Sequence, residues 1–216
     1  MTEIILVRHG QSLANLERRF AGQSHFPLTE TGFEQARRTA EYIVENYKIE
    51  ELYSSDLLRA FSTATPIATL LSVCPIKTDT GLREVDAGNW EGHTWEELDD
   101  YFPVQAKVWK EKINECCLEG GETIKEMAER SRKAIIELAR LNDNKTICLV
   151  SHATVIRAFE AFAQSGNLDN MTDVPWPTNA SVSLYTIDDG KIYPKLYSYD
   201  EFLEECRQQT LMEGGK

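Results

Sequence analysis

The sequence has no long apolar run, no basic excess and no paired cysteine motif. No apolar stretch approaches the ~18 residues that suggest a membrane span. The start of the chain has no basic region followed by a cleavage pattern, so it is not expected to be a signal peptide. Five cysteines without C-x-x-C spacing indicate free thiols in a reducing compartment, and the adjacent Cys116 and Cys117 are expected to be ordinary thiols. We therefore expect a cytoplasmic protein.

Positive charge is also scarce. The chain carries 35 acidic and 23 basic residues, which gives a formal net charge of −12 and a pI near 4.9. This charge balance argues against partners such as nucleic acid or an anionic membrane, because both are bound through basic patches. An anionic small molecule has to be bound in a local cationic pocket instead.

What the chain does contain is an alternation of strand and helix patterns. With 216 residues, it is expected to form one domain over residues 1–216. Continuous apolar runs at 4–7 and 146–150 are typical of strands buried on both faces of a parallel sheet, and shorter strands are expected at 51–56 and 75–78. The segment 181–197, turning at Asp189-Gly190, predicts a late hairpin at the sheet edge. The fold class is therefore α/β, a three-layer α/β/α arrangement with a mostly parallel central sheet.

The helix after the first strand has two candidate starts. Thr29 and Thr31 can both cap it, and Glu34 follows Thr31 at the spacing of a capping box. Apolar residues from Phe33 onward recur at helical spacing and are expected to face the sheet. A second helix is expected over 57–71, where Pro66 should kink or interrupt it.

Two further helical segments are expected in the second half of the chain. Residues 94–109 have a helical pattern that Pro103 divides. Thr123, followed three residues later by Glu126, forms a capping box after the Gly120-Gly121 break and predicts a long helix.

Histidines follow two of the predicted buried strands. His9 ends the first strand and His152 ends the strand at 146–150. Open parallel sheets bind ligands beyond the carboxyl ends of their strands, so the pair indicates a site where a single histidine would indicate only a core hydrogen bond. Arg8, beside His9, and Arg59, in the turn SSDLLRA, can clamp phosphate oxygens there.

Several motifs together resemble the histidine phosphatase superfamily, the phosphoglycerate-mutase-like proteins. They span most of the chain from Ile4 to Arg157 and occur in the family's order: LVRHGQSLANLERRFAGQSHFPLTETGFEQA, SSDLLRAFSTA, LREVDAGNWEG, GGETIKEMAER and LVSHATVIR. The combination is specific, whereas RHG alone is not.

The resemblance implies a role for each matching residue. His9 is implied to be the nucleophile that becomes phosphohistidine, and Glu84 the proton donor to the leaving group. The phosphoryl group is implied to be bound by Arg8, Arg59 and His152, and the phosphate pocket to be supported by Asn15 and Ser12. Phosphoryl transfer needs mainly positioning and charge stabilisation, so these residues can act with no metal and no cofactor. Burial of Glu84 against Trp90 is expected to raise its pKa so that it can donate a proton.

The sequence lacks the motifs of other classes of phosphatase. No cysteine has an arginine six positions later, and D-x-D, H-E-x-x-H and P-loop motifs are absent. The remaining histidines, His25 and His93, have no neighbours at metal-ligand spacing. We expect a small phosphorylated substrate and no metal.

The resemblance covers both hydrolases and mutases. Mutases carry an arginine pair after the acid glutamate, whereas here no arginine occurs between Glu84 and Arg130. Gln23 and His25 also depart from the mutase pattern, and Thr154 replaces the asparagine that follows the second histidine. Hydrolysis is therefore the predicted activity and mutase-type transfer the alternative. A catalytically silent interaction module of the same fold is a third possibility, disfavoured because the core residues are all present.

The sequence does not identify the substrate or the oligomeric state. Specificity is expected to depend on residues 92–122 and the neighbouring loops.

Overall fold

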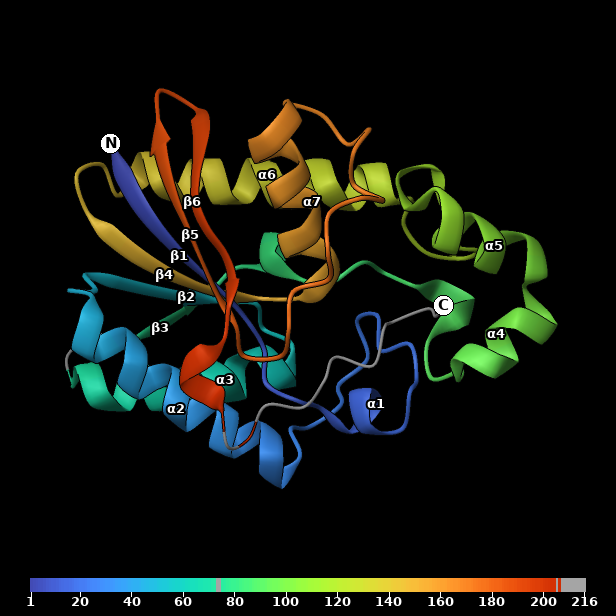
Figure 1. Ribbon diagram of the computed structural model, residues 1–216, viewed down its shortest axis with the longest axis horizontal. Helices are drawn as coiled ribbons and strands as arrows, with labels where there is room; N and C mark the ends of the chain where they lie inside the picture. The colour runs from blue at the N-terminus through green and yellow to red at the C-terminus, as the bar shows by residue number, and fades with distance from the viewer. Residues whose placement is uncertain (73–74, 205, 207–216) are drawn as a thin grey trace.

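The computed structural model describes residues 1–72, 75–204 and 206 and is built around one six-stranded sheet (Figure 1). The strand order is β3-β2-β4-β1-β5-β6. The strands are β1 (Thr2–Arg8), β2 (Glu51–Ser54), β3 (Ile76–Thr78), β4 (Thr146–Ser151), β5 (Val182–Asp188) and β6 (Lys191–Tyr199). The first four pair in parallel, while β5 runs antiparallel to β1 and forms the edge hairpin with β6. The mostly parallel sheet and the late hairpin agree with the prediction.

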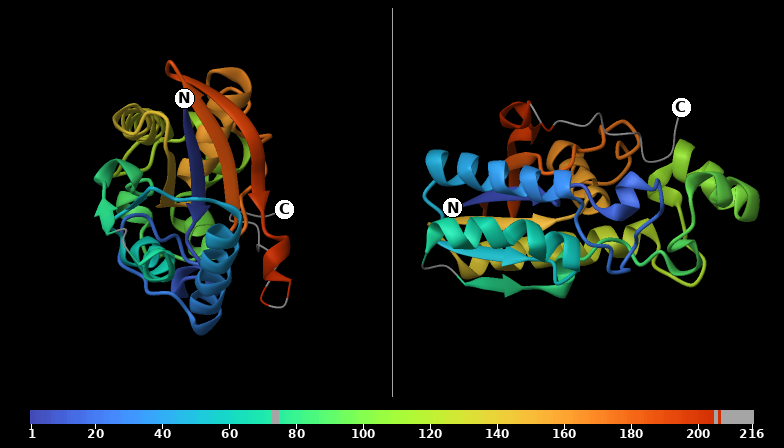
Figure 2. Two further views of the ribbon diagram at one scale, coloured as in Figure 1. Left: turned by 90° about the vertical axis from the view of Figure 1, so that its left-hand side faces the viewer. Right: turned by 90° about the horizontal axis from the view of Figure 1, so that it is seen from below.

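Helices α2 (Glu30–Asn46) and α3 (Leu58–Leu71) cover one face of this sheet, and α6 (Ile124–Leu141) and α7 (Ala153–Ser165) cover the other. Helices α1 (Leu13–Leu16), α4 (Trp95–Tyr101) and α5 (Pro103–Glu111) lie beyond the ends of the strands. Successive residues of a strand point to opposite faces. Accordingly Ile5 and Val7 of β1 pack with α2 and α3, whereas Ile4 and Leu6 pack with α6 and α7. Figure 2 shows the resulting three layers, as predicted.

Helix α2 begins earlier than its capping-box pattern indicated. Thr29 is the N-cap, and its hydroxyl accepts from the amide of Gly32 at 3.0 Å. Thr31 lies inside the helix and the capping box predicted with Glu34 is wrong. The buried side of α2 includes Gly32 and Ala36. Phe33 lies at the margin of this side and is 55% exposed. The prediction that Phe33 faces the sheet is also wrong.

Helix α3 runs without a break through Pro66. The proline lies on a partly exposed side of the helix, where water can bond the carbonyl that loses its helical partner. The expected interruption is therefore absent from this helix.

The later helices follow their sequence signals. Thr123 caps α6 as predicted: its hydroxyl accepts from the amide of Glu126, and its own amide donates to the Glu126 carboxylate. Pro103 occupies the first turn of α5, so the 94–109 segment is divided into two helices at the predicted place. Both helices lie at the end of the molecule toward which β1 and β4 run (Figure 1). None of the helices within the described residues is both long enough and apolar enough to span a membrane.

Candidate active site

The register between β1 and β4 brings the two predicted histidines together. Arg8 pairs with Ser151, so the next residue of each strand is a histidine at the same edge of the sheet. The amide of His9 donates to the carbonyl of Ser151 at 3.0 Å, and the rings of His9 and His152 lie 5.2 Å apart between centroids. Both side chains are buried.

Hydrogen bonds set the tautomer of His9. Its Nδ1 lies 2.7 Å from the carbonyl oxygen of Gly10, which can only accept, so Nδ1 carries the proton. The opposite nitrogen, Nε2, accepts from Nε of Arg59 at 3.3 Å. Burial lowers the pKa of His9 well below its usual value, and the charges of Arg59 and Arg8 lower it further. The ring is therefore neutral at physiological pH and has its lone pair on Nε2.

His152 is held by a hydroxyl. Its Nε2 lies 2.9 Å from Oγ of Ser55, while its Nδ1 is buried without a hydrogen-bond partner among the described residues. Burial lowers the pKa of His152 well below its usual value. Electrostatic interactions with Arg59, His9, Arg8 and Arg130, in that order of size, lower it further. His152 also precedes α7, whose first residues, Ala153 and Thr154, line a cavity beside His9 that is described below. A helix N-terminus favours a bound anion at that place.

The two buried histidines predict that the protein loses stability as the pH falls below about 6.5, the pKa of an unfolded histidine. Between that pH and their lowered folded pKa values, only the unfolded chain binds the two protons. Each histidine should add a slope of about 1.4 kcal/mol per pH unit to the free energy of unfolding, with higher pH favouring the folded state. Urea denaturation from about pH 7.5 to 5.5 measures this slope. His152→Asn should roughly halve it, and an unchanged slope would contradict the assignment.

Two buried arginines bring positive charge to the histidines. Arg59, at the start of α3, donates from Nη1 to the carbonyl of Ser24 at 2.9 Å and from Nη2 to that of Gly22 at 2.7 Å. Arg8 donates from Nη1 to the carbonyl of Pro177 at 2.6 Å. A backbone carbonyl carries no net charge, so these bonds orient the two guanidinium groups without cancelling their positive charge.

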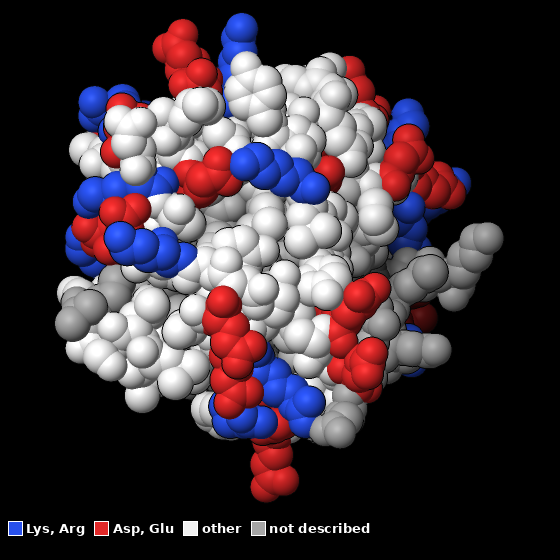
Figure 3. All heavy atoms as spheres, turned by 60° about the vertical axis from the view of Figure 1, so that its left-hand side comes forward, with Lys and Arg blue, Asp and Glu red and all other residues white. Residues whose placement is uncertain are grey.

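Surface charges differ from this arrangement. On the face in Figure 3, blue and red side chains lie beside one another around a largely uncharged centre. Arginines nearer the surface pair with carboxylates, as the exposed Arg37 and the half-buried Arg38 do with Glu34. Arg8 and Arg59, by contrast, are buried and donate to backbone carbonyls.

A cavity opens beside His9 and collects several of the predicted residues. It is lined by His9, Asn15, Arg19, Phe20, Ala21, Gly22, Arg59, Glu84, Trp95, Trp109, Ala153 and Thr154. Ser12, Arg8 and His152 are not in this lining. Ser12 is fully buried and caps α1, where its amide and hydroxyl both donate to Oδ1 of Asn15, at 3.1 and 3.0 Å. Ser12 therefore orients Asn15, which lines the cavity.

Glu84 is buried at the wall of the same cavity. Its Oε1 accepts from the amide of Val85 at 2.9 Å and its Oε2 from the amide of Thr154 at 3.3 Å. The apolar neighbours in the cavity are Phe20, Trp95 and Trp109, whereas Trp90 lies behind them, in edge contact with Phe20. The apolar surroundings of Glu84 were predicted to come from Trp90; in the structure Phe20, Trp95 and Trp109 form this aromatic wall instead.

The aromatic wall was not predicted from the sequence. Phe20 packs edge to face against Trp95 and Trp109, with centroids 5.3 and 4.9 Å away. Trp95 and Trp109 come from α4 and α5, within the 92–122 segment expected to govern specificity. An aromatic pattern in that segment is the signal that could have identified them.

The other histidines and cysteines considered in the sequence, His25, His93, Cys116 and Cys117, are not among the residues that line the cavity. His25 is exposed and accepts from the amide of Leu58, and His93 lies 3.5 Å from Glu97. Burial raises the pKa of the Cys116 thiol to about 12, so it stays protonated.

Paired imidazoles, buried arginines and a carboxyl group at the carboxyl edge of a parallel sheet define a site for phosphoryl transfer. Residues 4–200 match the histidine phosphatase superfamily (branch 1), and the chain belongs to this family. Phosphoglycerate mutase-like protein 4 of Arabidopsis thaliana is 31% identical over 189 residues, which cover 87% of this chain and 80% of that protein. The metal-independent phosphoserine phosphatase of Arabidopsis thaliana is 30% identical over 193 residues, covering 88% and 79%.

A solved structure shows the same fold. Bacillus stearothermophilus YhfR superposes with a TM-score of 0.88 at 26% identity, and the alignment covers 94% of this chain and 100% of that one. The names of the relatives include both a phosphatase and a mutase-like protein, so the choice between hydrolysis and transfer depends on the residues of this chain.

Proposed function

We propose that this protein is a phosphatase that hydrolyses a small phosphomonoester through a phosphohistidine intermediate on His9, without a metal. The observation that carries the proposal is the state of His9. Its Nδ1–H is bonded to Gly10 and its Nε2 lone pair lies against Arg59 at the cavity. A neutral imidazole whose unprotonated nitrogen lies at the cavity beside an arginine is in the form that attack on phosphorus requires.

In the first step Nε2 of His9 attacks phosphorus and the bond from phosphorus to the ester oxygen breaks. Arg59 and Arg8 stabilise the equatorial oxygens, and His152 with Asn15 completes the binding of the phosphoryl group. Glu84, in its protonated form, gives its proton to the departing oxygen, and the alcohol leaves.

In the second step water attacks the phosphorus of phospho-His9. The carboxylate of Glu84, now ionised, takes a proton from that water, and the bond between phosphorus and Nε2 breaks. The amides of Val85 and Thr154 donate to the two oxygens of this carboxyl group and hold it at the cavity wall. Inorganic phosphate leaves and His9 returns to its neutral state.

Chelation is expected to leave the rate unchanged. Among residues 1–72, 75–204 and 206, no three His, Cys, Asp or Glu side chains are grouped so that they could hold a metal ion. The two buried arginines supply the positive charge that a metal would otherwise supply. Turnover of p-nitrophenyl phosphate should be measured before and after EDTA treatment. Loss of activity that a divalent ion restores would contradict the metal-independent mechanism.

Hydrolysis is expected to exceed mutase activity. Among the described residues that line the cavity, none of the arginines comes from the segment after Glu84; apart from Arg59 they include Arg19, which follows α1. Release of phosphate from 3-phosphoglycerate should therefore outpace its conversion to 2-phosphoglycerate. Phosphate release and isomer formation should be followed in the same reaction. Isomerisation faster than phosphate release would favour the mutase alternative, and no turnover across a broad phosphomonoester panel would favour the silent module.

A further inference from the structure

One ion pair outside the cavity lining binds the backbone that carries Glu84. Arg130, in the second turn of α6, pairs with Glu122, just before that helix. Nε donates to Oε1 at 2.8 Å and Nη2 to Oε2 at 2.7 Å. The two side chains are only 26% and 23% exposed, whereas those of the Arg140–Glu137 pair on the same helix are 69% and 51% exposed. A bidentate pair shielded in this way holds its geometry better than an exposed pair.

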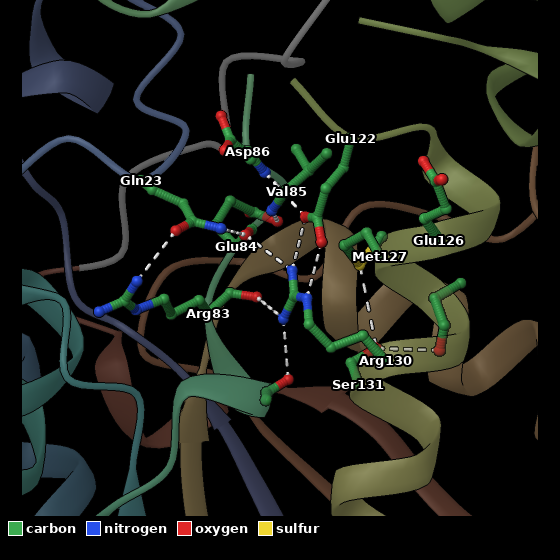
Figure 4. A network of polar contacts seen from close by, with 12 residues as sticks. Gln23, Arg83, Glu84, Val85, Asp86, Glu122, Glu126, Met127, Arg130 and Ser131 are labelled. Carbon is green, nitrogen blue, oxygen red and sulfur yellow. Dashed lines mark hydrogen bonds and ion pairs between the residues drawn. The ribbon is translucent and has the colours of Figure 1, made fainter. Parts of the chain in front are cut away.

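The remaining N–H groups of Arg130 donate to the segment that leads into Glu84. Nη1 donates to the carbonyls of Gly81 and Arg83, both at 3.0 Å, and Nη2 donates to the carbonyl of Glu84 at 3.1 Å. With the two bonds to Glu122, these account for all five N–H groups of a guanidinium. Figure 4 shows Arg130 reaching from α6 to these carbonyls.

Glu122 holds the same segment on the other side of Glu84. Its Oε2 accepts from the amide of Asp86 at 3.0 Å, and its own amide donates to the carbonyl of Asp86 at 2.8 Å. Burial raises the pKa of Glu122, but the bonds from Arg130 and from the Asp86 amide outweigh burial and keep that pKa below its usual value. Glu122 is therefore ionised at neutral pH, and together with Arg130 it binds the backbone at and on both sides of Glu84.

We infer that Arg130 and Glu122 are positioning residues for the proton transfer assigned to Glu84, an inference that rests on the proposed function. Arg130 is absent from the cavity lining, so it acts through the backbone of Glu84. A general acid must stand within hydrogen-bond reach of the departing oxygen. Misplacing such a group by about 1 Å can slow a reaction about 100-fold.

The variant Arg130→Lys tests whether the arrangement of the Arg130 hydrogen bonds matters, apart from its positive charge. Lysine keeps the positive charge near His152 but replaces the planar five-donor fork with one ammonium, so it cannot make the same set of bonds. Arg140→Lys is the matched control, because it makes the same change in the exposed pair with Glu137.

Phosphorylation of His9 should be measured by rapid quench with two esters of similar shape. p-Nitrophenyl phosphate has a leaving group that needs little protonation, whereas p-nitrobenzyl phosphate releases an alkoxide that needs a proton. Arg130→Lys should slow phosphorylation by the benzyl ester about 10–100-fold and by the phenyl ester less than about threefold. Arg140→Lys should change neither rate. A reduced folded fraction would lower both rates equally, so the ratio of the two rates is the decisive quantity.

The double variant tests whether Arg130 acts through Glu84. In a Glu84→Gln background there is no acid to position, so adding Arg130→Lys should cause no further slowing with the benzyl ester. Further slowing in that background, or equal losses for both esters, would overturn the positioning role. A wild-type protein that forms no phosphoenzyme with either ester would reject the proposed function, and this inference with it. If Glu84→Gln shows the leaving-group effect and Arg130→Lys does not, only the positioning role is wrong.

Discussion

His9→Ala is expected to lower kcat for any phosphomonoester by a factor on the order of 10⁴–10⁶, because it removes the nucleophile and leaves only the binding groups. The fold should survive the change. The ring of His9 makes its bonds to Gly10 and Arg59 at the edge of the sheet, and the amide of His9, which bonds to Ser151, is retained. Steady-state kinetics with p-nitrophenyl phosphate, together with a thermal melt, measure both effects.

His93→Ala is the matched control for this variant. His93 is partly exposed, lies beside Glu97, and is absent from the cavity lining. Its replacement should leave kcat within about twofold of the wild-type value. If His9→Ala instead retained more than a few per cent of the activity while His93→Ala lost it, the nucleophile would have to be another residue.

Glu84→Gln is expected to slow phosphorylation of the enzyme by alkyl phosphates by roughly 10²–10⁴, the usual contribution of general acid catalysis. The amide has the shape of the carboxyl group but cannot transfer a proton, and an alkoxide is a poor leaving group without one. p-Nitrophenolate leaves with little help, so phosphorylation by p-nitrophenyl phosphate should be slowed much less. Hydrolysis of the phosphoenzyme should be impaired whichever substrate formed it, because the same carboxylate acts as base in that step.

Single-turnover experiments separate the two steps. The rate of phosphoenzyme formation should be compared for p-nitrobenzyl and p-nitrophenyl phosphate, followed by its decay after the substrate is removed. Equal losses in formation for the two esters would mean that Glu84 only positions the phosphate. The acid would then have to be sought elsewhere, and Asp86, two residues further on, is the first candidate.

The sheet and the histidine pair could be predicted because short-range patterns determine them. Two apolar runs too short for helices form neighbouring parallel strands, and each run ends in a histidine. Since parallel strands end at the same edge, the pattern places His9 and His152 at one edge of the sheet, and the structure adds that their strands are neighbours. Turn and cap residues such as Thr123 and Asp189 act on adjacent backbone and are equally visible in sequence.

Helix α2 shows where local patterns fail. Thr29 and Thr31 both have a side chain that can cap a helix. The backbone amide of Thr29 also donates to the carbonyl of Gln11 at 2.9 Å, and Ser12 pairs with Leu28 in a β-bridge. These contacts join segments that are far apart in the chain, so the sequence around residue 30 does not rank the two caps.

The surroundings of the site depend on still longer-range contacts. The motif supplied Glu84 and Asn15, but the aromatic wall around Phe20 is formed by helices of a different segment. The bonds from Arg130 go to backbone carbonyls, which every residue has, so no residue type at the receiving positions indicates them. Ser12, which the resemblance implied to support the phosphate pocket, lies outside the cavity lining and donates to Asn15, which is in that lining.

Trapping the intermediate tests the central claim most directly. The enzyme should be mixed with a ³²P-labelled phosphomonoester, quenched in alkali within milliseconds, and digested to locate the label. We expect base-stable, acid-labile label on the peptide that contains His9, forming at least as fast as turnover and absent from the His9→Ala variant. Turnover that proceeds with no label on His9 at any quench time would contradict the phosphohistidine mechanism.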